Sequence, residues 1–486
     1  MRRSKILVLV GTLVALVAAT LAVNAAASVP QARAASGFAF TNYQLGTAFI
    51  GESCPNATVA CTNLAAEPAI RADAAGRFYG SSENGLGGGT QAWRSSDGGL
   101  HYTTLASPNA LSQTSQPTVA PGGGDTDLAV ATAPNANGLY NVYVASLNLA
   151  SVDVSTSTDG GNSWSLNPIG ANIVGDDREW IAADGASKVC ISYHDAATFN
   201  IIVNCSTDAG TTFTQTGQAF DTNHLFSTNA NEIGNLAIDP ASHIVYQTYS
   251  SIDLQDQTNP NPVGNHVVYM AVSTDGGQTF TDHTVFDNPN VAVSYGHQFV
   301  NVSVDSAGNV YSVFTDDHNV SYSFSTDHGQ TWSAPVQVNA APANTAIMPW
   351  SVAGGPGKLD IVYYGTSYFD GVNTPDNYPS SAAWNVYFAQ NLKAAKAGSK
   401  FTQVTASPVN HFGGACESGV TCTGNRDLFD DFGVAANPTT GLASIIYSDD
   451  QFDAAQPTKC TQAQNNTSSC DHTSVATQTG GGRIFP

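Results

Sequence analysis

The sequence predicts an all-β protein, a β-propeller built from four-stranded blades, with seven blades favoured and six as the alternative. Composition is the first observation: the 486 residues include 45 Gly and 22 Pro, and the acidic residues are 32 Asp and only 6 Glu. Asp suits turns and Glu suits helix interiors, so this bias favours a turn-rich β structure. Because 42% of the residues are hydrophobic, the chain has enough material for a core, which excludes wholesale disorder.

A short motif that occurs five times is the second observation. Each copy reads Ser-x-Asp-x-Gly with an aromatic residue three positions after the Gly, and the copies lie at residues 95–102, 157–164, 206–213, 273–280 and 325–332. The Asp accepts hydrogen bonds from the backbone N–H groups that follow it, and the Gly supplies a backbone conformation that a side chain would oppose. Each copy therefore predicts a hairpin turn, after which the aromatic residue begins a strand and packs inward.

The spacing of this motif is the third observation. Its Asp residues lie 62, 49, 67 and 52 positions apart, and irregular periods near fifty are typical of propeller blades with variable loops. Two further units, which carry strand patterns at 359–364 and 432–447, lack the Asp turn. A β-sandwich or a β-helix does not explain a four-stranded unit with one turn type. The predicted blades are 67–105, 122–170, 176–220, 231–286, 297–338, 344–407 and 425–480.

The two ends of the chain complete this prediction. A strand within 38–45 is expected to join the last blade and close the ring, which would remove exposed sheet edges. Residues 1–34 have basic residues, an apolar run at 6–23 and the sequence Ala-Arg-Ala at 32–34, which predicts a cleaved secretory signal peptide. A retained membrane anchor is the alternative. Residues 35–486 are then one secreted propeller domain that is free of the membrane.

The eight Cys residues agree with export. They fall into pairs that are close in sequence, namely Cys54 with Cys61, Cys190 with Cys205, Cys416 with Cys422, and Cys460 with Cys470. An even number at short spacings in an exported chain predicts disulfides that pin local loops or hairpins. This pairing is the simplest of several, because connectivity does not follow from sequence.

The charge of the chain excludes one class of partner. Lys and Arg number 16 against 38 Asp and Glu, and the formal net charge is −22. Binding to nucleic acid needs clustered basic residues, so a nucleic-acid-binding surface is not expected.

The five turns resemble the Asp-box (BNR) repeats of the sialidase-like propellers, and the resemblance covers most of residues 67–338. Two later stretches, 344–354 and 416–428, resemble a group of exported actinobacterial proteins labelled sialidase-like. The resemblance implies a propeller whose Asp turns are structural and lie away from the active site, so none of the five Asp residues is expected to be catalytic. It implies a fold strongly and an activity weakly, since one fold hosts many activities.

The sequence departs from the sialidases of this superfamily at their arginine triad. The resemblance implies a first Arg within an Arg-Ile-Pro motif at the first blade, but residues 66–70 read Ala-Glu-Pro-Ala-Ile. Only Arg178 and Arg426 precede the first strand of a predicted blade. The triad is therefore not recognisable, which leaves open whether sialic acid is a substrate and whether the chain is an enzyme.

Polar residues just before the first strands of the blades are expected to converge at one end of the central channel. The candidate catalytic residues are Glu179, Glu232 and Asp431, because paired carboxyl groups act as acid and base, or as nucleophile, on a glycosidic bond. The candidate substrate-binding residues are Arg178 for an acidic group, Trp350 for stacking on a sugar ring, and His297 and Arg426.

The alternative interpretation of these acids is structural. They would then cap strands, pair with Arg178 or Arg426, or bind a structural Ca²⁺ in the channel, since carboxylates are the ligands that Ca²⁺ prefers. No cofactor is required by the leading hypothesis, and the sequence does not identify a metal site.

That leading hypothesis is a secreted, sialidase-like glycoside hydrolase, expected to be a monomer, that acts on extracellular glycans or polysaccharides. Three alternatives stay open. A polysaccharide lyase would use His297, Tyr295 and Arg178. A non-catalytic propeller would bind a glycan or a protein, and a purely structural extracellular protein would do neither.

Overall fold

The computed structural model describes most of the region after residue 36. The described residues are 37–45, 67–83, 89–109, 122–148, 151–171, 173–419, 422, 425–451 and 472–486. The predicted signal peptide at 1–34 and the Cys pairs Cys54–Cys61 and Cys460–Cys470 lie outside them. Among the residues described, every helix is too short or too polar to span a membrane.

The described strands form seven antiparallel sheets of four strands each, which confirms the seven-bladed propeller. The first three sheets hold β2 (Ala69–Ala72), β3 (Phe78–Ser82), β4 (Gln91–Ser95) and β5 (Thr103–Thr104); β6 (Thr126–Val130), β7 (Val142–Leu147), β8 (Val152–Ser157) and β9 (Ser165–Asn167); and β10 (Asp176–Asp184), β11 (Lys188–Asp195), β12 (Asn200–Ser206) and β13 (Gln215–Gln218). In each sheet the strands pair in chain order, as hairpins joined by turns require.

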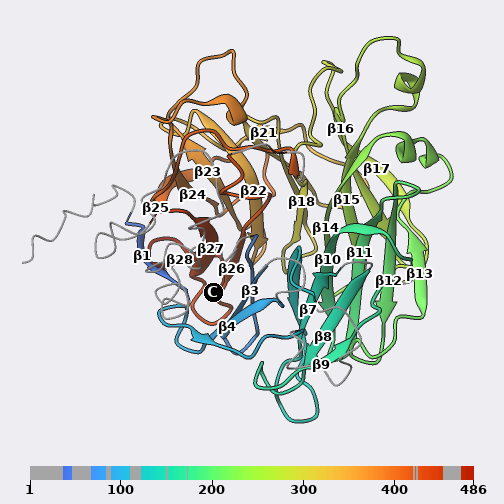
Figure 1. Cartoon of the computed structure of the whole chain (residues 1–486), viewed down its shortest axis with the longest axis vertical. Coiled ribbons are helices and arrows are strands. Elements are labelled where there is room, and N and C mark those ends of the chain that lie inside the picture. Colours follow the sequence, from blue (N-terminus) through green and yellow to red (C-terminus); the bar gives the residue numbers. More distant parts are fainter. Residues whose placement is uncertain are drawn as a thin grey trace, which may run out of the picture. The chain divides into compact units, whose positions relative to one another are not determined.

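The next three sheets repeat this pattern (Figure 1). They hold β14 (Asn231–Ile238), β15 (Val245–Ser251), β16 (Val267–Ser273) and β17 (Thr281–Asp287); β18 (Asn301–Val304), β19 (Val310–Thr315), β20 (Val320–Ser325) and β21 (Val336–Gln337); and β22 (Thr345–Ala353), β23 (Leu359–Thr366), β24 (Ala383–Asn391) and β25 (Thr402–Phe412). The described helices are short 3₁₀ turns in loops, namely η1 (Leu225–Asn229), η2 (Leu254–Thr258) and η3 (Pro375–Asn377).

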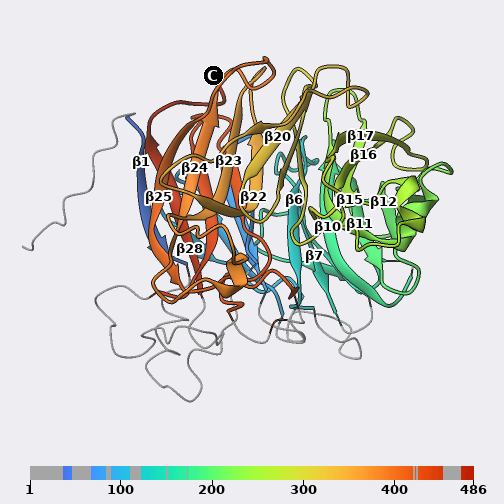
Figure 2. The same cartoon turned by 90° about the horizontal axis from the view of Figure 1, so that it is seen from above.

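The seventh sheet joins the two ends of the propeller. It holds β26 (Gly433–Ala436), β27 (Ala443–Asp449), β28 (His472–Gly480) and, as the fourth strand, β1 (Ala39–Gln44). The predicted closing strand therefore pairs with β28, and Figure 2 shows blue β1 beside the orange and red strands of the last two blades. The first strands of successive sheets contact one another, and β26 contacts β2, so the ring is closed.

Strand direction gives the channel two distinct ends. Because neighbouring strands are antiparallel, the starts of all seven first strands and the ends of all second strands lie at one end, which we call the mouth. The turns between third and fourth strands lie at the opposite end. The five Asp turns join these strands in the first five blades, so they lie away from the mouth.

Hydrogen bonds explain why the Asp turns recur. In the fourth copy of the motif, Asp275 accepts from the backbone N–H of Gln278 and Thr279, each at 3.0 Å, and from the Thr279 hydroxyl at 2.6 Å. The backbone of Gly277 has φ +99°, where a side chain would be strained. Gln215 of the preceding blade donates to the carbonyl oxygen of Gly276 at 2.8 Å. The turn thus holds itself together and ties two blades to each other.

Two of the predicted disulfides form among the described residues. Cys190 and Cys205 join neighbouring strands β11 and β12, and Cys416 and Cys422 close a loop of the sixth-to-seventh blade connection. The loop closed by Cys416 and Cys422 lies at the mouth, since it follows the end of a fourth strand.

Candidate functional site

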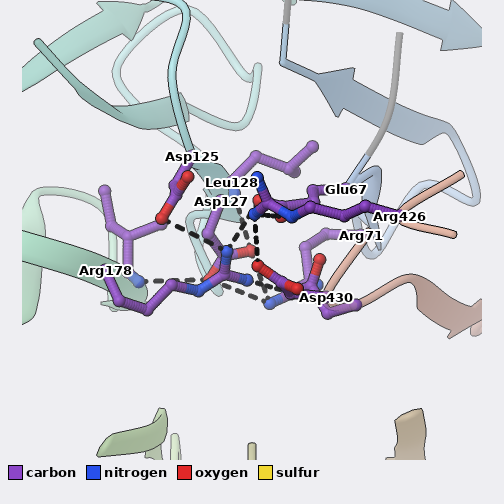
Figure 3. Close-up of polar contacts among 10 residues, drawn as sticks. Glu67, Arg71, Asp125, Asp127, Leu128, Arg178, Arg426 and Asp430 are labelled. Carbon is purple, nitrogen blue, oxygen red and sulfur yellow. Dashed lines mark hydrogen bonds and ion pairs between the residues drawn. The ribbon is translucent and has the colours of Figure 1, made fainter. Parts of the chain in front are cut away.

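Acidic residues and two Arg meet at the mouth, in a group that we call the mouth cluster. Its members are Glu67, Glu83, Asp125, Arg178, Glu179, Arg426, Asp430 and Asp431. Six of the eight are acidic, so two guanidinium groups face six carboxyl groups. Figure 3 shows the guanidinium groups of Arg178 and Arg426 facing Glu67 and neighbouring carboxylates.

The backbone at this end of the first strands is irregular, and that irregularity directs the side chains. The register of β10 against β11 shifts between Asp177 and Glu179, so Arg178 is an extra, bulged residue. Arg178 has φ +53° and Glu67 has φ +47°, in the left-handed region that costs a non-Gly residue free energy. Such strained positions cluster at functional sites, which supports the mouth as the candidate site.

Arg178 is the centre of the cluster. It donates to Glu67 Oε2 at 2.9 Å and to Asp431, and it lies 3.6 Å from Asp125 Oδ2. Its guanidinium carbon also lies 4.3 Å from the ring centres of Trp180 and Phe299. The side chain is only 6% exposed. Arg178 is therefore saturated by groups of the protein itself, with only Nε lacking a hydrogen-bond partner.

Arg426 lies closer to solvent than Arg178. Its Nη2 donates to Asp430 Oδ2 at 2.6 Å and lies 3.5 Å from Glu67 Oε1, and its side chain is 30% exposed. Glu67 thus bridges the two Arg residues. Arg426 is the cation of the cluster that a ligand can reach.

Glu179 is the unusual acid of the cluster. The residue is 1% exposed, and neither carboxyl oxygen has a hydrogen-bond partner among the described residues. Burial, followed by the charge of Asp125, raises the pKa of Glu179 well above its usual value, although Arg178 acts in the opposite direction. A buried carboxyl group without a partner is costly when ionised, so the environment of Glu179 favours its protonated form.

Two further predicted residues also keep a proton more strongly than usual. Burial and the charge of Asp177 raise the pKa of Glu232 to about 8. Burial raises the pKa of Asp431 to about 7, although its ion pair with Arg178 opposes the shift. Glu67 and Glu83 are raised well above their usual values, first by burial and then by the charge of Asp125. The mouth therefore holds carboxyl groups that exchange protons near neutral pH.

Aromatic side chains fill the channel below the cluster. Trp180 packs against Trp350 with ring centres 5.0 Å apart, and Trp350 is only 4% exposed. Arg71 lies 5.6 Å from the Trp350 ring centre and donates to Asp127 at 2.9 Å. Beyond them, toward the end opposite the mouth, lies a cavity of about 280 Å³ that Arg71 and Trp350 line together with the later parts of the first strands.

His297 belongs to a second group at the mouth. Its Nδ1 lies 2.7 Å from Asp317 Oδ2, and ligand atoms of His297, Asp317 and Glu417 all lie within 4.8 Å of one another. The hydrogen bond to Asp317 raises the pKa of His297, and the charge of Glu232 acts in the same direction. His297 is exposed, so it faces solvent beside Glu232.

The structure brings most of the predicted site residues to one place. Arg178, Glu179, Arg426 and Asp431 belong to the mouth cluster, and Glu232 and His297 interact electrostatically at its edge. Trp350 lies apart from them, packed inside the channel. The sequence interpretation did not single out Glu83, Asp317 or Glu417. The rarity of Glu is a sequence signal that could have identified Glu83 and Glu417. The chain has only 6 Glu, and every Glu that the structure describes lies at the mouth.

The acids suit a hard cation only in part. One carboxylate oxygen each of Glu67, Glu83 and Asp125 lies within 4.8 Å of the others, which fits the ligand type of Ca²⁺. However, Arg178 and Arg426 already supply positive charge to Glu67. The structural Ca²⁺ considered from the sequence stays a prediction.

Comparison with known proteins found no matching family model and no matching curated protein. Solved structures with a similar chain trace include an α-L-arabinofuranosidase from Fusarium graminearum, with 15% identity, a TM-score of 0.43, and coverage of 62% of this chain and 88% of that one. A Penicillium chrysogenum α-L-arabinanase has 10% identity, a TM-score of 0.41, and coverage of 84% and 92%. The NanB sialidase of Streptococcus pneumoniae, as its K499G mutant, has 10% identity, a TM-score of 0.38, and coverage of 85% and 67%. Likeness at these scores carries no information on the activity of this chain.

Proposed function

We propose that this protein is a secreted glycoside hydrolase whose acid–base groups are the carboxyls at the mouth of the propeller. One observation carries the proposal: six acidic side chains share two Arg at the mouth, where burial favours the protonated form of Glu179 while ion pairs with Arg favour the ionised form of other carboxyl groups. Glycosidic bonds are cleaved by a protonated and an ionised carboxyl acting together.

The proposal gives each predicted residue a role. Glu232 is the general acid, because it is half-buried and keeps its proton up to a pKa of about 8. Asp431 is the base or nucleophile, since Arg178 fixes its carboxylate. Glu179 is a neighbour of Arg178 whose burial raises its pKa, which limits the negative charge of the cluster. Arg178 then positions Asp431 and does not itself bind substrate.

The same charges suggest the substrate class. Arg178 is already bound by protein carboxylates, and the mouth has more acids than cations, so an anionic sugar would be repelled. Neutral sugars offer hydroxyl groups that donate to carboxylates. We therefore propose a neutral extracellular carbohydrate as the substrate, with Arg426 and His297 as exposed contacts at the edge.

Release of sugar by the purified full chain tests the proposal. The panel consists of neutral glycans, sialosides and uronate polysaccharides, with reducing sugar measured for hydrolysis and ultraviolet absorbance for elimination. We expect hydrolysis of a neutral glycan, with a rate maximum between about pH 7 and pH 8, because Asp431 ionises near pH 7 and Glu232 loses its proton near pH 8.

Three conservative variants assign the roles. Glu232→Gln and Asp431→Asn are each expected to lower the rate by about 10²- to 10⁴-fold, and Glu179→Gln to lower it by a smaller factor. Asp275→Asn, in a turn at the opposite end, is the matched control and should keep full activity. Unchanged rates in both Glu232→Gln and Asp431→Asn would remove the catalytic assignment.

A propeller that binds glycans without cleaving them is the second candidate. It is favoured by the burial of the central groups, since Glu179 is 1% exposed and the Arg178 side chain 6%. Saturable glycan binding with no product from any member of the panel would establish this candidate instead.

A further inference from the structure

The group of His297, Asp317 and Glu417 differs from the other clusters of ionisable residues in its partners. Asp317 is 8% exposed; its Oδ2 is bonded to His297, and its buried Oδ1 receives no hydrogen bond from an N–H group of the described residues and faces the carboxyl group of Glu417. Among the described residues, no Arg or Lys forms an ion pair with Asp317 or Glu417. The two carboxyl groups therefore meet with His297 and the side-chain amide of Gln298 as their partners, and without a permanent positive charge from the described residues.

Two other clusters of the same size are compensated. In the group of Asp221, His224 and Asp282, both carboxylates accept hydrogen bonds from backbone N–H groups, and Asp282 also accepts from Tyr249 at 2.8 Å. In the group of Glu67, Glu83 and Asp125, two Arg supply positive charge.

A third cluster is closed to solvent. His411 is 1% exposed and uses both ring nitrogens, toward Asp450 at 2.7 Å and the carbonyl oxygen of Gly414 at 2.8 Å. His297, in contrast, is exposed, and among the described residues only its Nδ1 takes part in a hydrogen bond. It is the imidazole of these clusters that faces solvent beside carboxyl groups.

The three side chains are held in place by the fold. Gln298, next to His297, donates to Glu417 through its side-chain amide and accepts the backbone N–H of Met348. Glu417 follows Cys416, which is fixed by its disulfide to Cys422 and by a backbone hydrogen bond to Asn425 at 2.7 Å. Asp317 lies in the turn after β19 with φ +71°. The group is thus assembled by three separate segments around one point.

We propose that His297, Asp317 and Glu417 bind one divalent transition-metal ion of the Zn²⁺ type at the mouth. One imidazole and two carboxylates match the ligands of open zinc sites, which use three protein ligands and leave a position for water or a ligand. A doubly charged cation neutralises the two carboxylates when His297 is neutral. Because one ligand is an imidazole, Zn²⁺ fits better than Ca²⁺, which takes oxygen ligands.

The three ligand atoms need to move only slightly to bind one metal ion. Ligand atoms on one Zn²⁺ at about 2 Å lie about 3 to 3.5 Å apart, and the three ligand atoms here already lie within 4.8 Å. The proposal concerns metal binding alone and does not depend on the proposed hydrolase activity. Its failure therefore leaves that activity untouched, and the reverse also holds.

Isothermal titration of the full chain, purified without a histidine tag, with ZnCl₂ tests the site. We expect one saturable Zn²⁺ per chain and a higher melting temperature with Zn²⁺. Asp317→Asn and Glu417→Gln should each weaken binding at least about tenfold. Asn tolerates the left-handed backbone at position 317, and melting curves without metal confirm that each variant folds.

The matched control is His224→Gln, in a cluster of the same composition whose carboxylates are satisfied by the protein. It should bind Zn²⁺ as the unaltered chain does. The proposal is overturned by an absence of saturable Zn²⁺ binding, by unchanged affinity in Asp317→Asn and Glu417→Gln, or by loss of binding in His224→Gln. Tighter binding of Ca²⁺ than of Zn²⁺, with affinity retained in His297→Ala, would likewise contradict it.

Discussion

The pKa values of acidic residues shift in opposite directions in the Asp turns and at the mouth. In the Asp turns, hydrogen bonds from the Thr331 hydroxyl, then from Ser325 and the Thr331 backbone, lower the pKa of Asp327 to about 2. At the mouth, burial raises the pKa of Asp431 to about 7 and that of Glu232 to about 8. The turns favour the ionised form because donors surround it, whereas the mouth favours the protonated form because burial removes water from the carboxyl groups.

The comparison separates structure from candidate chemistry. A carboxylate that is fully satisfied by its own turn has no capacity left for a ligand, while an unsatisfied one stores free energy that a ligand or a proton can use. The same residue type therefore serves stability at one end and the candidate site at the other.

Removal of Arg178 is expected to have the largest effect on the mouth cluster. Arg178→Met leaves Glu67, Asp125 and Asp431 without their shared cation, which we expect to lower the free energy of unfolding by about 3 to 5 kcal/mol at pH 7. The loss should shrink at pH 5, where the unpaired carboxyls are protonated. Denaturant titration measures both values.

Arg483→Gln is the control for this change, because within the described part of the chain Arg483 donates only to the carbonyl oxygen of Thr440 at the surface, at 2.9 Å. It should leave the free energy of unfolding nearly unchanged. If Arg178→Met costs no more than this control, the mouth cluster is not held together by its ion pairs.

The pH dependence of stability is expected to distinguish the carboxyl groups at the mouth from those in the Asp turns. Glu232 and Asp431 bind protons more tightly in the folded than in the unfolded chain, so their contribution is complete below the unfolded pKa values of about 4. It is lost as the pH rises through about 7 and 8. We expect the free energy of unfolding to fall by about 2 kcal/mol between pH 6.5 and pH 8.

The double variant Glu232→Gln, Asp431→Asn should remove most of this fall, as followed by denaturant titration at each pH. The Asp turns have the opposite sign: their lowered pKa values stabilise the fold above the unfolded pKa, and this contribution is lost as the pH falls toward about 2. A free energy of unfolding that rises from pH 5 to pH 8 would contradict the assignment at the mouth.

A single Asp turn gives the smallest expected effect. Asp275→Ala removes hydrogen bonds to Gln278 and Thr279 and should lower the free energy of unfolding by about 1 to 2 kcal/mol. Asp370→Ala, in an exposed loop near the mouth whose Asp bonds Val372 and Asn373, compares a loop turn with a turn that ties blades together. Equal costs would mean that the blade contact through Gly276 adds nothing.

Much of the fold followed from local sequence signals. The Asp turn, the strand alternation around it and the spacing of its copies predicted four-stranded blades, and the strand at 38–45 was expected where β1 closes the seventh sheet. These features depend on residues near one another in the chain, so composition and pattern carry them. Two disulfides followed for the same reason, since each joins Cys residues only 15 and 6 positions apart.

The sequence predicted the candidate site only in outline. The expectation that residues at the beginning of a first strand converge placed Arg178 at the mouth, where it meets Asp431, 253 positions away. Trp350 has a similar position in sequence, but the register of β22 shifts between Ile347 and Trp350, and its ring packs on Trp180 inside the channel. The sequence prediction considered only residues near the first strands. Glu83 and Glu417 lie at the mouth but follow the ends of a second and a fourth strand.

The sequence by itself determined the blades, because turns and strands are set by neighbours along the chain. Only the tertiary structure decided which carboxyls share a cation, which bind a proton more tightly than usual and which lie beside His297. Those properties depend on burial and on charges contributed by distant blades, and a pattern of residues along one strand contains neither.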